Sequence, residues 1–173
     1  MITAAHCVEG AGAFPVLDGV IAGAHKRKGE VGHQQRHIAS LEKHEDHNNP
    51  RFNNDVAIIT VSEPFDFTDP HVQPIAMFMS DDAEIPAGTV CNATGWGLTN
   101  GAGIFGPNAL QWVQIPALSH EDCENLHPGY ITDGMVCAGS QGHTVCNVSS
   151  VYSLNSTLME VLDNYYTDYS SPG

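Results

Sequence analysis

The hydrophobic residues of this chain occur in short runs, separated by glycine, proline and other turn-forming residues. Residues 56–61 form a nearly continuous apolar run, which is typical of a buried strand. Residues 110–116 instead alternate apolar and polar positions, as a half-buried strand does. Shorter apolar segments predict further strands near Ile2 and at residues 19–23, 38–44 and 89–91. Many short strands with frequent turns indicate an all-β chain that forms barrels or a sandwich.

Two segments predict helices. Ser119 is a good N-cap residue, and Glu121 and Asp122 follow it within one turn, so a short helix is expected there. In the tail, apolar residues recur at helical spacing and predict an amphipathic helix. These residues are Leu154, Leu158, Val161, Leu162, Tyr165, Tyr166 and Tyr169.

The charge is strongly acidic and unevenly distributed. The 173 residues carry a formal net charge of −14, and no lysine or arginine occurs after Arg51. Such a surface repels nucleic acid and anionic membranes, so neither is expected as a partner. No apolar run approaches the roughly 20 residues that span a bilayer, so no transmembrane helix is expected.

Four short motifs are more specific than the hydrophobic pattern. A histidine and a cysteine follow a small-residue strand end at ITAAHC, and an aspartate precedes the buried run at NNDVAII. Two further motifs are CNATGWG and MVCAG, and the four occupy residues 2–7, 53–59, 91–97 and 135–139. In this order, the motifs resemble the trypsin/chymotrypsin family of serine endopeptidases over residues 1–147.

The resemblance implies a trypsin-like double antiparallel β-barrel with the active site in the cleft between the barrels. It divides the chain into a partial N-terminal barrel at 1–70, a connector at 71–88 and a partial C-terminal barrel at 89–147. Residues 148–173 do not resemble the family, and the predicted tail helix has no counterpart in it. We therefore expect a fold that is incomplete at both ends.

By resemblance, His6 is the general base and Asp55 is the acid that orients it. Ser150 falls at the spacing from Cys146 that the nucleophile would have, but its surroundings differ from the family motif. Val148 stands where the family has a glycine whose N–H helps to form the oxyanion hole, and Ser149 replaces an aspartate. The chain is therefore expected to be of serine-endopeptidase lineage but catalytically incomplete.

The resemblance also assigns the substrate pocket and the cysteines. Thr144 matches the pocket floor, where trypsin-like enzymes have an aspartate, so a preference for basic residues is not expected. Cys123 and Cys137 match a family disulfide. Cys7 would bridge to a cysteine before Met1, and Cys91 and Cys146 would bridge to cysteines after Asn147. These three are therefore not expected to form family bridges within this chain.

Two other interpretations stay open. His33, His37, His44 and His47, with Glu45 and Asp46, could bind zinc or copper, although solvated histidines on a polar loop explain them more simply. Alternatively, the chain could be a non-catalytic protease homologue that binds peptides. We expect no metal and no cofactor. The resemblance further implies a protein or peptide substrate, a monomer and a secreted, extracellular location.

Overall fold

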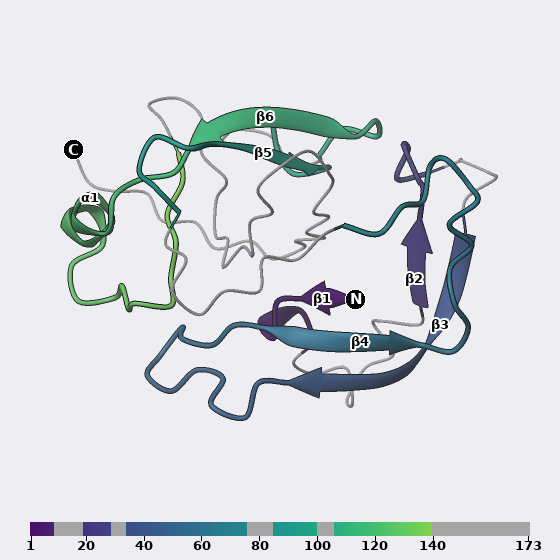
Figure 1. Cartoon of the computed structure of the whole chain (residues 1–173), viewed down its shortest axis with the longest axis horizontal. Helices are drawn as coiled ribbons and strands as arrows, with labels where there is room; N and C mark the ends of the chain where they lie inside the picture. The colour runs from purple at the N-terminus through teal and green to yellow at the C-terminus, as the bar shows by residue number, and fades with distance from the viewer. Residues whose placement is uncertain (9–18, 29–33, 76–84, 100–105, 140–173) are drawn as a thin grey trace.

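The computed structural model of the chain describes residues 1–8, 19–28, 34–75, 85–99 and 106–139 (Figure 1). Within these ranges the fold is mostly β, with two antiparallel sheets and one short α-helix. The first sheet has the order β1-β4-β3-β2, from Ile2–Thr3, Ala57–Val61, Gln34–Lys43 and Gly19–Ala22. The second pairs β5 (Val90–Gly95) with β6 (Gln111–Pro116).

The first sheet curls because β3 changes partner along its length. Its first residues pair with β2, and its later residues pair with β4 from Ile38 to Lys43. The register between β3 and β4 shifts between Ile38 and Ser40, and such a bulge bends a strand and increases its twist. The sheet therefore has the shape of a half-barrel.

The second sheet has its own small core, as the alternation along β6 predicts. Ile115 is fully buried and packs with Cys91 and Ala117, which are also buried. Trp112, on the same strand, is 70% exposed. Alternate residues of β6 thus face the core and the solvent, which is the expected pattern for a strand buried on one face.

The helix α1 (His120–Leu126) begins where the sequence predicts. The Ser119 hydroxyl accepts a hydrogen bond from the backbone N–H of Asp122 at 3.0 Å and donates one to the Asp122 carboxylate at 2.6 Å. Cys123 anchors the buried face of the helix through its disulfide to Cys137, with a Cα–Cα distance of 5.8 Å. The cap and the disulfide therefore fix both the start and the packing of α1.

Replacing Ser119 with alanine is expected to lower the free energy of unfolding by about 1 kcal/mol, because the N–H of Asp122 loses its acceptor. Urea unfolding followed by far-UV circular dichroism measures this difference. Ser119→Asn is the matched control, since asparagine is an equally good N-cap residue and its amide can also donate to the Asp122 carboxylate. Equal losses in the two variants would show that the cap contributes nothing.

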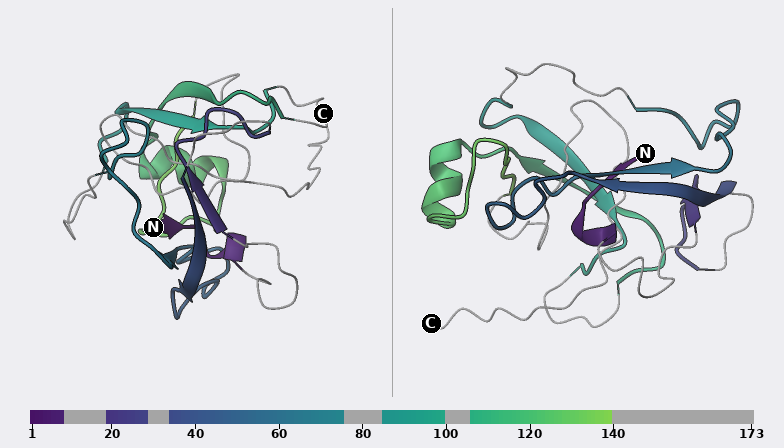
Figure 2. Two further views of the ribbon diagram at one scale, coloured as in Figure 1. Left: turned by 90° about the vertical axis from the view of Figure 1, so that its right-hand side faces the viewer. Right: turned by 90° about the horizontal axis from the view of Figure 1, so that it is seen from below.

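Contacts between distant segments join the two sheets. Lys26, after β2, forms an isolated β-bridge with Ala109, just before β6. The indole N–H of Trp96 donates to the carbonyl of His25 at 3.3 Å, and the N–H of Leu110 donates to the same carbonyl at 2.8 Å. In Figure 1 and in the left view of Figure 2, the β5–β6 sheet lies on the opposite side of β1 from β3. β1, the edge strand of the first sheet, therefore lies on the side of that sheet nearer to the β5–β6 sheet.

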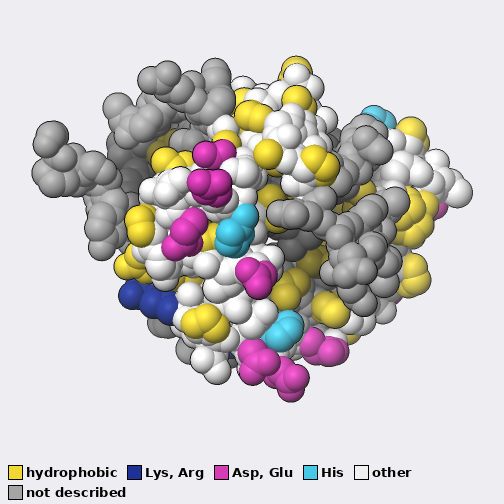
Figure 3. All heavy atoms as spheres, turned by 60° about the vertical axis from the view of Figure 1, so that its left-hand side comes forward, with side chains coloured by type: hydrophobic (Ala, Val, Ile, Leu, Met, Phe, Trp, Pro, Cys, Tyr) yellow, Lys and Arg dark blue, Asp and Glu magenta, His cyan; other side chains and the backbone are white. Residues whose placement is uncertain are grey.

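The structure confirms the predicted fold class and differs mainly in the extent of β3. The sequence predicts that strand from residue 38, but it begins at Gln34 because four more residues pair with β2. Within the described ranges, no helix is long and apolar enough to cross a membrane. Figure 3 shows a face on which several acidic side chains are spread, with little basic side-chain surface visible and most of it at one edge. The predicted tail helix lies outside the described residues.

Candidate active site

His6 is positioned by the small residues that precede it. After β1, Ala4 and Ala5 are buried, and their small side chains let the chain pass close to β4. The 3-10 helix η1 (His6–Val8) follows, and the N–H of Val8 donates to the carbonyl of Ala5 at 3.1 Å. Ala5, Val8 and Ala57 form one buried cluster. This packing fixes the backbone of His6 while 39% of its side chain stays exposed.

Asp55 is positioned by a sequence of turns between β3 and β4. The Asn48 side chain accepts a hydrogen bond from the backbone N–H of Phe52 at 2.8 Å, and the Asn48 N–H donates to the carbonyl of Asn53 at 2.8 Å. Asn48 and Asn54 have φ values of 65° and 54°, a region that asparagine tolerates better than most residues. The asparagines of this loop therefore suit the path that brings Asp55 to His6.

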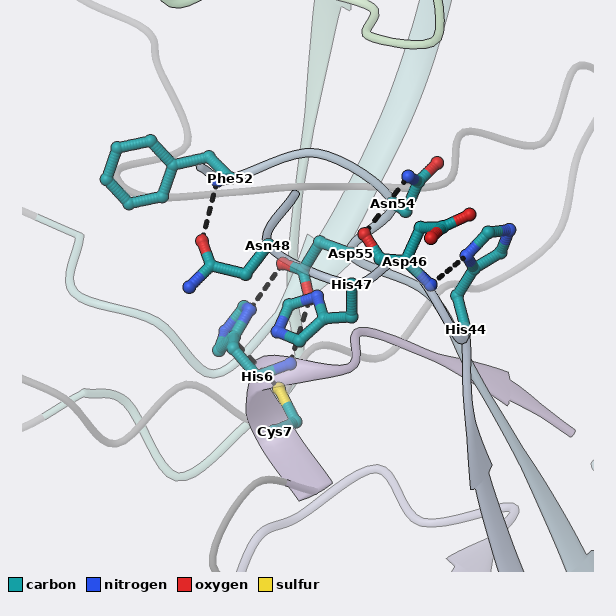
Figure 4. Close-up of polar contacts among 9 residues, drawn as sticks. All are labelled: His6, Cys7, His44, Asp46, His47, Asn48, Phe52, Asn54 and Asp55. Carbon is teal, nitrogen blue, oxygen red and sulfur yellow. Dashed lines mark hydrogen bonds and ion pairs between the residues drawn. The ribbon is translucent and has the colours of Figure 1, made fainter. Parts of the chain in front are cut away.

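The Asp55 carboxylate contacts His6 with both oxygens (Figure 4). Oδ2 lies 2.5 Å from Nδ1 of the imidazole, and Oδ1 accepts the backbone N–H of His6 at 2.8 Å. Only 6% of the Asp55 side chain is exposed. Because an ionised carboxylate can only accept hydrogen bonds, this contact favours the imidazole tautomer with its proton on Nδ1. The lone pair on Nε2 is then available to accept a proton.

His47 is a third member of the site. The sequence names it only as a possible metal ligand and does not predict that it lies beside Asp55. Its Nδ1 lies 3.8 Å from Oδ1 of Asp55, and its side chain is only 9% exposed. The interpretation as a solvated loop histidine is therefore wrong for His47. No sequence pattern distinguishes His47 from His44, whose Nδ1 accepts the Asp46 N–H at 3.1 Å instead.

Cys7 is the fourth member. Its Sγ lies 3.5 Å from Nε2 of His6, on the ring nitrogen opposite the one that faces Asp55 (Figure 4). The sequence shows that Cys7 follows His6, but adjacency alone does not tell which ring nitrogen a neighbouring side chain approaches.

The loop that carries Asp55 also contacts the segment after α1. The hydroxyl of Thr132 donates to the Asn53 side chain at 2.9 Å. The rings of Phe52 and Tyr130 are 6.1 Å apart between centroids, and the Arg51 guanidinium lies 4.5 Å from the Phe52 ring centroid. Phe52 and Tyr130 are 48% and 56% exposed. An exposed aromatic pair therefore lies where the two halves of the molecule meet.

The structure brings His6 and Asp55 together, and it places Cys123 and Cys137 in a disulfide. Ser150, Thr144 and Cys146 lie outside the described residues, as does His33 of the possible metal site. Within the part of the chain that the structure describes, no three His, Cys, Asp or Glu side chains are arranged to hold a metal ion.

The sequence of this chain is similar to those of known serine proteases. A family model described as trypsin matches residues 1–150. Serine protease 1 of Rattus norvegicus is 34% identical over 160 residues, which cover 85% of this chain and 61% of the relative. Brachyurin of Leptuca pugilator is 32% identical over 157 residues, covering 90% and 66%.

Among solved structures, neuropsin, a serine protease expressed in the limbic system of mouse brain, matches with a TM-score of 0.67 and 27% identity. The match covers 80% of this chain and 59% of neuropsin. This chain thus spans about three fifths of the length of such relatives.

Proposed function

The chain belongs to the trypsin family of serine proteases, and on this premise we propose that His6 and Asp55 are the base and the orienting acid of an endopeptidase site. The observation that supports the proposal is the contact of both Asp55 oxygens with His6, at 2.5 and 2.8 Å. The contact of Oδ1 with the backbone N–H holds the carboxylate beside His6, and the contact of Oδ2 with Nδ1 orients the imidazole ring. In serine-type acyl transfer the carboxylate has this orienting role.

The chemistry follows from the tautomer. With Nδ1–H directed at Asp55, Nε2 accepts the proton of an attacking hydroxyl and later returns it to the leaving amine. The buried carboxylate stabilises the imidazolium that forms between these steps. The substrate class implied by the family is a protein or peptide.

We further propose that this chain does not complete the reaction. The residues around the expected nucleophile are Val148, Ser149 and Ser150, in place of the Gly-Asp-Ser of the family. Acyl transfer needs a positioned nucleophile and backbone N–H donors for the oxyanion as well as a base. The His6–Asp55 pair supplies only the base.

A fluorophosphonate probe tests this proposal directly. Such a probe reacts with an activated serine and is detected on that residue by peptide mass mapping. We expect no labelling of Ser150 in the full chain, at a probe concentration that labels bovine trypsin stoichiometrically. Stoichiometric labelling of Ser150 that disappears in the His6→Ala variant would instead show a complete serine-type site.

A second candidate function is peptide binding without cleavage. The observation that favours it is the exposed aromatic pair, Phe52 and Tyr130, beside the His6–Asp55 site. Aromatic side chains supply much of the binding energy at protein interfaces. A peptide library is screened for peptides that bind to the chain and stay uncleaved. If the chain is a binding module, the Phe52→Ala, Tyr130→Ala double variant should no longer bind the peptides that the unmodified chain retains.

We also propose an extracellular location and a monomeric state. The disulfide between Cys123 and Cys137 supports the location, because disulfides persist in oxidising compartments. Sedimentation of the chain under non-reducing conditions would measure the oligomeric state.

A further inference from the structure

Asn92, on strand β5, begins the sequence Asn92-Ala93-Thr94. An asparagine two residues before a threonine or serine, with any residue except proline between them, is the acceptor sequence for N-linked glycosylation. Two more such sequences begin at Asn147 and Asn155, outside the residues that the structure describes. Because these short sequences also occur by chance, the position of Asn92 in the fold decides whether a glycan fits there.

The side chain of Asn92 lies on the solvent face of the β5–β6 sheet. Its two neighbours on the strand face the core of this sheet, where Cys91 is 2% exposed and Ala93 packs against the buried cluster. Because side chains alternate between the two faces along a strand, Asn92 points away from that core, and it is exposed. A glycan attached to Asn92 therefore extends into solvent and displaces no core side chain.

The hydrogen bond that holds the Asn92 amide is made by its oxygen. Gln114, the cross-strand partner of Asn92 on β6, donates from Nε2 to Oδ1 of Asn92 at 3.2 Å. N-linked glycosylation takes place at the other atom of the amide, Nδ2. The sheet therefore orients the Asn92 side chain by a contact that glycosylation does not break.

We propose that Asn92 is an N-glycosylation site and that the first sugar of its glycan covers Trp112. The donor is an oligosaccharide linked to a lipid pyrophosphate, and an oligosaccharyltransferase of the secretory pathway catalyses the transfer. A bond forms between Nδ2 of Asn92 and the anomeric carbon of N-acetylglucosamine, while the bond from that carbon to the pyrophosphate oxygen breaks. The lipid pyrophosphate leaves with the electron pair of this bond, and a base of the transferase takes one amide proton. The proposal rests on the extracellular location proposed above, because the transfer takes place in the secretory pathway.

Two exposed apolar side chains lie beside Asn92 on the same face of the sheet. Trp112 pairs with Thr94 and is therefore diagonal to Asn92, and it is 70% exposed. Diagonal neighbours on adjacent strands are about 7–8 Å apart, within reach of an aromatic side chain. Val90, two residues before Asn92, is 58% exposed. A pyranose ring has an apolar C–H face, so packing it on the indole removes apolar surface of both groups from water.

The test directs the full chain into the secretory pathway of a mammalian cell line with an added, cleavable signal peptide. Chains that have lost the signal peptide are purified from cells and medium, and peptide-N-glycosidase in H₂¹⁸O converts each glycosylated asparagine to labelled aspartate. Peptide mass mapping then measures occupancy at Asn92 separately from Asn147 and Asn155. We expect a glycan on most copies of Asn92, and we expect Asn92→Gln to remove the label from this peptide and to increase the electrophoretic mobility of the chain.

Thr94→Val is the matched variant, because it keeps the branched shape of the side chain and removes the hydroxyl. It should abolish occupancy at Asn92, whereas Thr94→Ser keeps a hydroxyl and should retain the glycan. An unmodified Asn92 in chains that have lost the signal peptide, or occupancy that persists in Thr94→Val, would overturn the assignment. Because the added signal peptide supplies the route, such a result would reject the glycan and not the proposed location. His6→Ala should leave occupancy unchanged, so the result is also independent of the proposed active site.

The cover over Trp112 has its own measurement. The chain has two tryptophans, and Trp96 is only 6% exposed, so iodide quenches mainly the fluorescence of Trp112. A sugar packed on one face of the indole should lower the quenching constant about twofold relative to Asn92→Gln, because the other face of the ring stays accessible. Equal quenching constants in the glycosylated chain and in Asn92→Gln would show that the glycan does not cover Trp112.

Discussion

Peptide p-nitroanilides incubated with the purified chain are expected to show no hydrolysis above that measured with its His6→Ala variant. The physical reason is that peptide hydrolysis needs a hydroxyl nucleophile held against Nε2 of His6, and residues 148–150 do not match the family's nucleophile motif. Loss of the nucleophile alone lowers the rate of serine proteases by about 10⁴- to 10⁶-fold.

The measurement uses substrates with different residues before the scissile bond, because Thr144 does not predict a preference for basic residues. Bovine trypsin diluted to the detection limit calibrates the assay. Turnover by the chain that His6→Ala removes, on any substrate, would contradict the prediction. Turnover that persists in His6→Ala would indicate a contaminating protease.

Replacing Ile115 with alanine is expected to lower the free energy of unfolding by about 2–5 kcal/mol, the largest effect on stability that we expect. Ile115 is fully buried at the centre of the β5–β6 core, where it packs with Cys91 and Ala117. Truncation removes buried methyl groups and leaves a cavity that a two-stranded sheet can only partly close. Urea unfolding followed by intrinsic fluorescence measures the change.

Two variants of the same strand serve as controls. Ile115→Val removes one methylene group and is expected to lower stability by about 0.5–1.5 kcal/mol. Trp112→Ala changes a side chain that is 70% exposed, so it should have a much smaller effect than Ile115→Ala. If Trp112→Ala lowers the free energy of unfolding as much as Ile115→Ala or more, Ile115 is not at the centre of this sheet's core.

The sequence predicts His6 and Asp55 as a pair because each lies in a motif with a distinctive local pattern. His6 follows small residues at a strand end, and Asp55 precedes an apolar run that becomes β4. The helix after Ser119 is equally well predicted, because an N-cap is a local interaction. Such features depend on a few neighbouring residues and can therefore be predicted from the sequence without knowledge of the fold.

Other features depend on distant partners and were not predictable. The first residues of β3 are polar, and they form a strand only because β2 pairs with them. His47 lies in a polar loop, and only the turns of that loop bury it against Asp55. The domain boundaries near residues 70 and 88 stay a prediction.

If Asp55 holds the His6 imidazole in one tautomer, ¹⁵N NMR of the ring nitrogens in the full chain will detect it. At a pH where the ring is neutral, we expect a proton on Nδ1 and a lone pair on Nε2. Asp55→Asn should change this distribution, because an amide can also donate a hydrogen bond to the ring. A wild-type His6 with its proton on Nε2, or a tautomer ratio unaffected by Asp55→Asn, would show that Asp55 does not orient the ring.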